Sequence, residues 1–404
     1  MTKEKSTVPR LRFPGFTDAW KQRKLGEVAE KISQKNLDRQ YVETFTNSAE
    51  FGIISQRDFF EKNISSLDNI SGYYIVNPDD FVYNPRISNL APVGPIKRNK
   101  LGRVGVMSPL YTIFRFSDIH LDFVEKYFDT TIWHRYMELN GDSGARSDRF
   151  AIKDSVFKGL PIPLPTLPEQ EAIGSFFSDL DQLITLHQRK LDDVKELKKA
   201  LLQKMFPKGN GNDFPELRFP EFTDAWKQRK AMEIFKFVSD KGYADLPILS
   251  ASQELGMIRR DEIGIDIKYD KEAVANYKRV LPGQFVIHLR SFQGGFAWSE
   301  IEGLTSPAYT ILDFKEENSS KFWRNVLTSP NFIKKLETVT YGIRDGRSIS
   351  YSDFSTLNFV IPTLPEQEAI GSFFSDLDQL ITLHQRQLDH LKLLKKALLQ
   401  QMFI

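Results

Sequence analysis

The sequence predicts an α+β protein in which two strand-rich α+β domains are joined by two long helices that form an antiparallel coiled coil. Repetition within the chain supports this prediction. Residues 165–206 and 362–403 are identical at 37 of 42 positions, and residues 9–24 and 215–230 at 14 of 16. The blocks between these repeats diverge but share three short motifs in the same order. If the repeated helices run antiparallel, the two halves of such a chain close into a pseudo-twofold symmetric arrangement.

The long repeats are predicted to be helices. Thr166 and Glu169 have the spacing of a capping box, and Pro168 falls in the first turn, where a missing N–H costs little. A coiled-coil seam at alternating steps of three and four contains Phe177, Leu180, Ile184, His187, Leu191, Val194, Lys198, Leu201 and Met205. This stripe is widened by Leu183, Leu197 and Leu202. The extra width indicates either broad packing of two helices or a further partner on that flank. One such helix also fits an ordinary buried core, but two near-identical copies favour pairing with each other.

The two blocks, roughly 25–161 and 231–358, are predicted to be one fold with divergent surfaces. Three motifs are echoed: Phe81-Val82 with Arg86 and Phe285-Val286 with Arg290; Ser108-Pro109-x-Tyr111 and Ser306-Pro307-x-Tyr309; Gly144-x-Arg146 with Arg149 and Gly342-x-Arg344 with Arg347. Short β-type runs are expected at 73–76, 81–83, 111–114, 285–287 and 309–312, and helices around 121–139 and 320–337. The expected boundaries are a first domain at 1–164, a helix at 165–206, a linker at 207–214, a second domain at 215–361 and a helix at 362–404.

Composition limits the classes of function. A chain of 404 residues holds two or three domains. The absence of cysteine excludes disulfide scaffolds, thiolate metal sites and cysteine nucleophiles. No apolar stretch reaches the roughly 18 residues that span a bilayer, and no secretory signal opens the chain, so we expect a cytoplasmic protein without a membrane partner. The net charge of +2 is low for a protein that grips nucleic acid unaided, because phosphate neutralisation supplies most non-specific affinity.

No motif in the sequence indicates catalysis. We find no P-loop and no glycine-rich cofactor loop after a strand, and the six histidines lack metal-ligand spacing. Asn77-Pro78 and Asn84-Pro85 fit turns better than the active-site tetrapeptide of an adenine methyltransferase. His187 and His384 occupy equivalent seam positions, where a polar layer that sets helix register is a better interpretation than a metal site. The chain is therefore predicted to carry no catalytic residue, no metal and no cofactor of its own.

Basic and amide side chains in predicted loops are candidates for DNA contact. Arginine to guanine is the commonest specific base contact, and glutamine can read adenine. Alternatives remain open: the basic run at 97–103 also fits a solvated hairpin tip, and the loop arginines also fit side chains that bond loop carbonyls. The candidates are Arg86, Lys97, Arg98, Lys100, Arg103, Arg146, Arg149, Arg290, Gln293, Arg344 and Arg347.

These repeats resemble the conserved regions of type I restriction-modification specificity subunits. The resemblance rests on PTLPEQEAI leading a helix that ends KKALLQKMF, and on LRFPGFTDAW leading a block. It implies that the blocks are two target-recognition domains, each reading one half-site of a bipartite double-stranded DNA target. It also implies that the helices act as a spacer ruler and a docking site. The seam from Phe177 to Met205 would span roughly 42 Å, a little over one turn of DNA.

The partners implied by this resemblance are two methyltransferase subunits and two restriction/translocase subunits. S-adenosylmethionine, ATP and Mg are then cofactors of those partners. The two docking faces are not equal, because His390 replaces Asp193 and Leu393 replaces Glu196. Two alternatives remain: a scaffold with a coiled-coil core that binds no DNA, and an enzyme with an unrecognised site in one block. The first predicts no sequence-selective DNA affinity, and the second requires activity from the isolated chain.

Overall fold

A computed structural model describes residues 8–60, 69–142, 148–207, 214–253, 255–263, 273–340 and 349–404. The chain divides into two compact units, and each is described by itself. The first unit contains residues 1–188 and 386–404, and the second contains residues 189–385. Each long helix therefore contributes one segment to each unit.

The first unit is built on an antiparallel four-stranded sheet with the order β2-β9-β6-β7. Three two-stranded ribbons, β1 with β10, β3 with β4 and β5 with β8, complete its strands. The strands are β1 Lys21–Lys24, β2 Ala29–Ile32, β3 Phe45–Ser48, β4 Gly52–Ser55, β5 Tyr74–Val76, β6 Phe81–Tyr83, β7 Ile96–Arg98, β8 Gly105–Met107, β9 Thr112–Phe116 and β10 Pro161–Leu164. The short helices are α1 Leu25–Val28, α2 Gln56–Phe60, η1 Ile70–Gly72, α3 Leu121–Phe128, α4 His134–Asn140 and α5 Asp154–Phe157.

The second unit repeats this design, with a four-stranded sheet of order β12-β19-β16-β17 and the same three kinds of ribbon. Its strands are β11 Lys227–Lys230, β12 Phe235–Val238, β13 Leu249–Ser252, β14 Gly256–Arg259, β15 Lys278–Val280, β16 Phe285–Ile287, β17 Ala297–Trp298, β18 Gly303–Thr305, β19 Thr310–Phe314 and β20 Asn358–Ile361. Its helices are α7 Ala231–Ile234, η2 Arg260–Ile263, η3 Ala273–Asn276, α8 Ser291–Gly294, α9 Ser320–Leu327, α10 Pro330–Leu336, η4 Glu337–Val339 and α11 Tyr351–Ser355. The prediction of one α+β fold used twice is confirmed.

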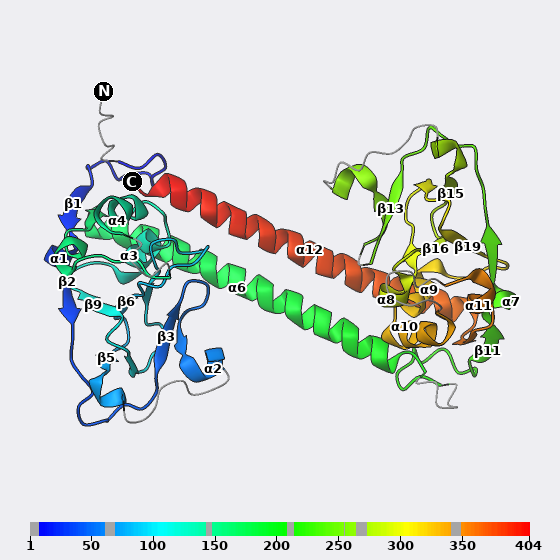
Figure 1. The fold of residues 1–404 in the computed structure, drawn as a ribbon, viewed down its shortest axis with the longest axis horizontal. Coiled ribbons are helices and arrows are strands. Elements are labelled where there is room, and N and C mark those ends of the chain that lie inside the picture. The colour runs from blue at the N-terminus through cyan, green and yellow to red at the C-terminus, as the bar shows by residue number, and fades with distance from the viewer. Residues whose placement is uncertain are drawn as a thin grey trace. The chain divides into compact units, whose positions relative to one another are not determined.

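The two long helices are α6, Leu167–Lys204, and α12, Leu364–Met402. In the first unit, Phe177 near the start of α6 lies against Phe403 at the end of the chain, with ring centroids 6.2 Å apart. The second unit reverses this, because Phe206 after α6 lies against Phe374 early in α12 at 6.2 Å. The segments of α6 and α12 are therefore antiparallel within each unit, as predicted, and both helices are labelled in Figure 1.

Aromatic side chains fill the core between the sheet, the short helices and the helix segments of each unit. In the first unit this core contains Phe81, Phe114, Phe123 and Trp133, all at most 3% exposed. In the second unit Phe235, Phe285, Trp323 and Phe354 form the corresponding cluster. Each aromatic ring buries a large apolar area, so the abundance of phenylalanine in the sequence is explained by these two cores.

The short repeat is fastened to the long repeat by a buried ion pair. The Arg12 guanidinium donates to both carboxylate oxygens of Glu169 at 2.6 and 2.7 Å, and the indole N–H of Trp20 also donates to Glu169. The second unit has the same contacts, with Arg218 at 2.6 and 2.7 Å from Glu366 and Trp226 at 3.2 Å. Instead of closing a capping box, each glutamate anchors the segment that precedes its domain. This contact explains why the two repeats occur together.

Candidate nucleic-acid interface

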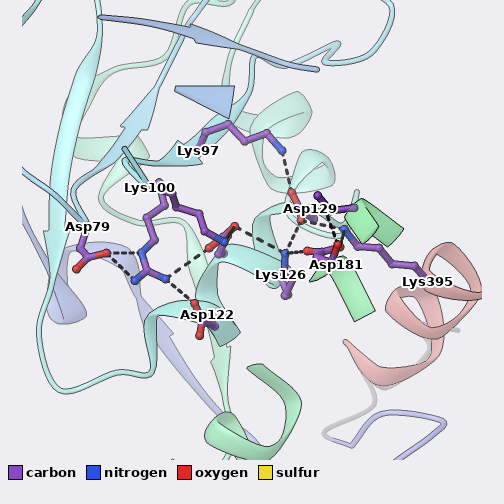
Figure 2. Close-up of polar contacts among 11 residues, drawn as sticks. Asp79, Lys97, Lys100, Asp122, Lys126, Asp129, Asp181 and Lys395 are labelled. Carbon is purple, nitrogen blue, oxygen red and sulfur yellow. Dashed lines mark hydrogen bonds and ion pairs between the residues drawn. The ribbon is translucent and has the colours of Figure 1, made fainter. Parts of the chain in front are cut away.

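The basic run at 97–103 is largely neutralised within the first unit, and Figure 2 shows Lys97 and Lys100 among the polar contacts of this region. Lys97 and Arg98 lie on β7, beside α3. Lys97 Nζ is 2.8 Å from Asp129, and the Arg98 guanidinium is 2.6 Å from Asp79 and 2.6 Å from Asp122. The Arg98 side chain is only 14% exposed. Matched charges at this burial leave little attraction for a phosphate.

The next two basic residues of this run are also paired. Lys100 Nζ lies 3.1 Å from Glu125. Arg103 makes a bidentate contact with Glu43, in which Nε and Nη2 each donate to one carboxylate oxygen at 2.8 Å. The hydrogen bonds from Arg103 hold the pKa of Glu43 below its usual range. Lys100 and Arg103 remain about half exposed, so they are better placed for phosphate contact than the β7 pair.

This charged cluster continues to the long helices through Lys126. The Lys126 side chain is 3% exposed, and its Nζ lies 2.5 Å from Asp181 on α6 and 3.4 Å from Asp129. Lys395 on α12 reaches the same Asp181 at 2.6 Å. Burial works to raise the pKa of Asp129, but the charges of Lys97, Lys126 and Lys395 hold it below its usual range. The network therefore fastens α3 to both helix segments of the first unit (Figure 2).

Two of the predicted arginines are brought together at a different place. Arg86 and Arg149 face each other in an antiparallel backbone bridge, with Phe150 N–H donating to Pro85 O at 2.7 Å. Asp148 lies 3.9 Å from Arg86 and 4.0 Å from Arg149, which are loose contacts. The Arg86 side chain is 64% exposed. This pair retains more free positive charge than the paired β7 residues.

A depression of about 920 Å³ lies next to this arginine pair. Arg149, Lys31 and Lys153 contribute basic side chains to its lining, and Asp142 and Asp154 contribute acidic ones. Lys31 Nζ is 2.6 Å from Asp154, so part of this charge is matched. The depression is therefore a polar surface beside the arginines, without the dense positive charge of a phosphate channel.

In the second unit, Arg290 is exposed just before α8, and Gln293 is exposed within it. No carboxylate of the described residues lies within ion-pair distance of Arg290. The backbone N–H of Arg290 donates to Nδ1 of His288 at 3.3 Å. Burial, together with the charge of Arg290, lowers the pKa of His288 to about 4. His288 is therefore neutral near pH 7 and keeps the acceptor that positions the Arg290 backbone.

Three candidates, Arg146, Arg344 and Arg347, lie outside the described residues. The hairpins β3–β4 and β13–β14 were not predicted from the sequence. They are hydrogen-bonded to the loops that carry Arg86 and Arg290. A fourth motif shared by the two blocks could have indicated these hairpins: Ser48-Ala-Glu-Phe-Gly52 in the first and Ser252-Gln-Glu-Leu-Gly256 in the second.

Within the described ranges, no three His, Asp or Glu side chains gather as a metal site would require. None of the described helices combines the length and apolarity needed to cross a membrane.

Comparison with known proteins relates this architecture to one family. The family model for the type I restriction modification DNA specificity domain matches residues 17–196 and again residues 224–393. The type I restriction enzyme MjaVIII specificity subunit of Methanocaldococcus jannaschii is 25% identical over 270 residues, which cover 61% of this chain and 62% of that protein. The putative MjaX specificity subunit of the same organism is 22% identical over 262 residues, covering 62% of this chain and 60% of that one. The matched region thus spans about three fifths of the length of these relatives.

Two solved structures share the fold. The type I restriction-modification S subunit from M. genitalium has a TM-score of 0.59 at 13% identity, covering 98% of this chain and 99% of that one. The second is a chain from a structural study of complex assembly and conformational transition of the type I R-M system. It has a TM-score of 0.51 at 12% identity, covering 95% of this chain and 97% of that one.

Proposed function

Because the chain belongs to the type I restriction-modification DNA specificity family, we propose that it is the subunit that reads the DNA sequence for a modification and restriction complex. Each domain reads one half-site of a bipartite double-stranded target. The long helices set the distance between the half-sites and bind methyltransferase subunits. Methyl transfer with S-adenosylmethionine, and cleavage with ATP and Mg, belong to two methyltransferase and two restriction subunits. This chain acts in the cytoplasm and carries no catalytic residue.

The observation that carries this proposal is the duplication of one surface with different side chains. The same sheet, hairpin and loop occur in both units, with Arg86 in one and Arg290 in the equivalent place of the other. The anchoring pairs at Glu169 and Glu366 are identical in kind. A fixed scaffold with variable loops is the arrangement expected of binding sites that differ in specificity.

Docking of partner subunits is supported by leucines on the long helices. The helix segments of the first unit expose Leu183, Leu186, Leu393 and Leu394, and those of the second expose Leu197, Leu380 and Leu383. The packed seam residues Phe177, Leu180 and Leu399 are buried, so the exposed leucines lie outside the packed seam. Two near-identical faces suit two copies of one methyltransferase subunit. If a partner subunit covers these leucines, it also explains why the apolar stripe in the sequence is wider than a two-helix seam requires.

The proposed function is tested by mapping methylated adenines in cells that contain this chain and its methyltransferase, compared with cells lacking the chain. We expect a two-part motif with a fixed gap that disappears with the chain. Exchanging residues 231–358 for the corresponding block of another family member should change only one part of the motif. Unchanged methylation, together with no sequence preference of the purified complex for DNA, would support the scaffold alternative instead.

The two docking faces should differ in affinity. Leu393 is 68% exposed in the first unit, whereas the equivalent position in the second is the exposed Glu196. Burying most of a leucine side chain contributes about 1 to 2 kcal/mol, which corresponds to about a tenfold difference in Kd. Titration calorimetry with the methyltransferase subunit should resolve two sites in the wild type. Leu393→Glu should make both sites weak and Glu196→Leu should make both strong; equal wild-type sites would contradict this account.

A further inference from the structure

Each unit leaves a large apolar side chain in solvent at the tip of one short hairpin. Phe51, between β3 and β4, is 62% exposed, and Leu255, between β13 and β14, is 68% exposed. Phe51 has an edge contact with Phe59, with ring centroids 6.3 Å apart, but Phe59 is itself 41% exposed. Most of the apolar surface of both tips therefore stays in water, where it contributes no burial energy. An apolar residue kept in solvent at the same place in two diverged domains points to a binding partner.

The two tips are held by the same turn. The Ser48 hydroxyl accepts a hydrogen bond from the Phe51 backbone N–H at 3.2 Å, and the Ser252 hydroxyl accepts one from Leu255 at 3.2 Å. A glycine follows in each case, with φ of 72° at Gly52 and 74° at Gly256. This left-handed conformation favours glycine, so the turn is specified by the sequence in both domains.

In the first unit, the hairpin is bonded to the loop that carries the exposed arginine. Asn47 of β3 donates to Pro95 O at 3.2 Å, and Asn84 donates to Asn47 O at 2.9 Å. The backbone N–H of Arg86 then donates to the Asn84 side chain at 3.0 Å. The strand that leads to the tip is therefore bonded directly to the loop that carries Arg86.

The second unit joins its tip to its arginine loop by a different bond. Gln253 donates from its amide to the Gln293 side chain at 3.2 Å, three residues after Arg290. The hairpin that carries Leu255 is thus bonded to the loop that carries Arg290, whose charge no described carboxylate matches. In both units, therefore, hydrogen bonds join the hairpin with an exposed apolar tip to the loop with an exposed arginine, although the bonds differ.

We propose that these tips contact the bases of the DNA target, Phe51 in one half-site and Leu255 in the other. The inference rests on the proposed function and names further specificity-determining residues for it. Apolar side chains read the thymine methyl group in the major groove or enter between base steps, while a neighbouring arginine binds guanine or phosphate. Apolar contacts add discrimination without positive charge, which suits a chain of net charge +2.

The test uses the full complex of this chain with its methyltransferase subunits and fluorescent duplexes that carry the mapped target or a scrambled one. Phe51→Ala and Leu255→Ala should each weaken binding to the target about tenfold or more, and leave binding to the scrambled duplex unchanged. Phe51→Leu and Leu255→Phe place each domain's residue in the other and should retain most of the affinity. Because both side chains are exposed, the thermal unfolding temperature should not change.

Each other outcome has a distinct meaning. If the wild-type complex prefers the target and both alanine variants bind it equally well, the tips do not touch the bases, and the proposed function stands. If the variants instead lose methyltransferase subunits in native mass spectrometry, the tips bind protein and the DNA contact is wrong. If the wild-type complex itself shows no preference for the target, the proposed function fails first.

Discussion

Replacing Glu169 with alanine is expected to destabilise the first unit by about 3 to 5 kcal/mol, the usual cost of removing one member of a buried ion pair. The Glu169 side chain is fully buried and accepts hydrogen bonds from both Arg12 and Trp20. Without it, the Arg12 guanidinium keeps only the Asp18 carbonyl as a partner among the described residues, and the Trp20 indole loses its acceptor. The segment before β1 should detach from the start of α6.

Hydrogen exchange measured by mass spectrometry tests this locally, which matters because two units need not unfold together. Peptides covering residues 9–24 and 165–180 should lose protection in the variant, whereas those of the second unit should not. Glu171→Ala is the matched control, because Glu171 is exposed two residues further along α6. The mirror pair, Glu366→Ala and Glu368→Ala, should move the same loss to the second unit. Equal protection in Glu169→Ala and Glu171→Ala would show that the anchor contributes little.

The parts of the fold that follow local periodicity were predictable from the sequence. The three-four spacing predicted α6 and α12, and β-type runs predicted β6 and β16 at the residues where they occur. The antiparallel direction followed from duplication, since each repeat had to present its seam to the other. These features depend on neighbouring residues or on the repeat itself, so one sequence is enough.

Which basic side chains of the candidate site are paired with carboxylates could not be predicted in the same way. Lys97 and Arg98 looked free because two of their partners, Asp122 on α3 and Asp129 directly after it, lie more than twenty residues away in the sequence. A signal existed: Asp122, Glu125 and Asp129 have helical spacing and form an acidic stripe. Nothing in the sequence showed that this stripe would face β7. Tertiary pairing, rather than residue type, decides which arginines remain available to DNA.

Replacing Lys126 with asparagine is expected to destabilise the first unit by about 3 kcal/mol, since it leaves a buried cluster of carboxylates short of one cation. Asparagine is the residue that the second unit has at the equivalent position, Asn325 on α9. In the second unit, Asp378 forms an ion pair with Lys198 at 2.5 Å. The counterpart of Asp129 is the neutral Thr328, so no second carboxylate has to be balanced at that position. The first unit therefore has one more buried cation and one more carboxylate than the second at these two positions, and the added charges balance each other.

A double variant separates charge balance from loss of packing. Lys126→Asn with Asp129→Thr copies the second unit, and it should recover about 1.5 kcal/mol of the loss, within the range of coupling energies between contacting residues. Asp129 has a lowered pKa, so its contribution to stability is present above pH 4 and is lost as the pH falls through its folded pKa. In Lys126→Asn that pKa rises toward its unfolded value, so the cost of the substitution should shrink as the pH falls and Asp129 becomes protonated in both proteins. Urea unfolding followed by hydrogen exchange, at pH 7 and at a pH below about 4, measures both effects. A double variant no more stable than the single one would mean that Lys126 stabilises by filling space, with little contribution from its charge.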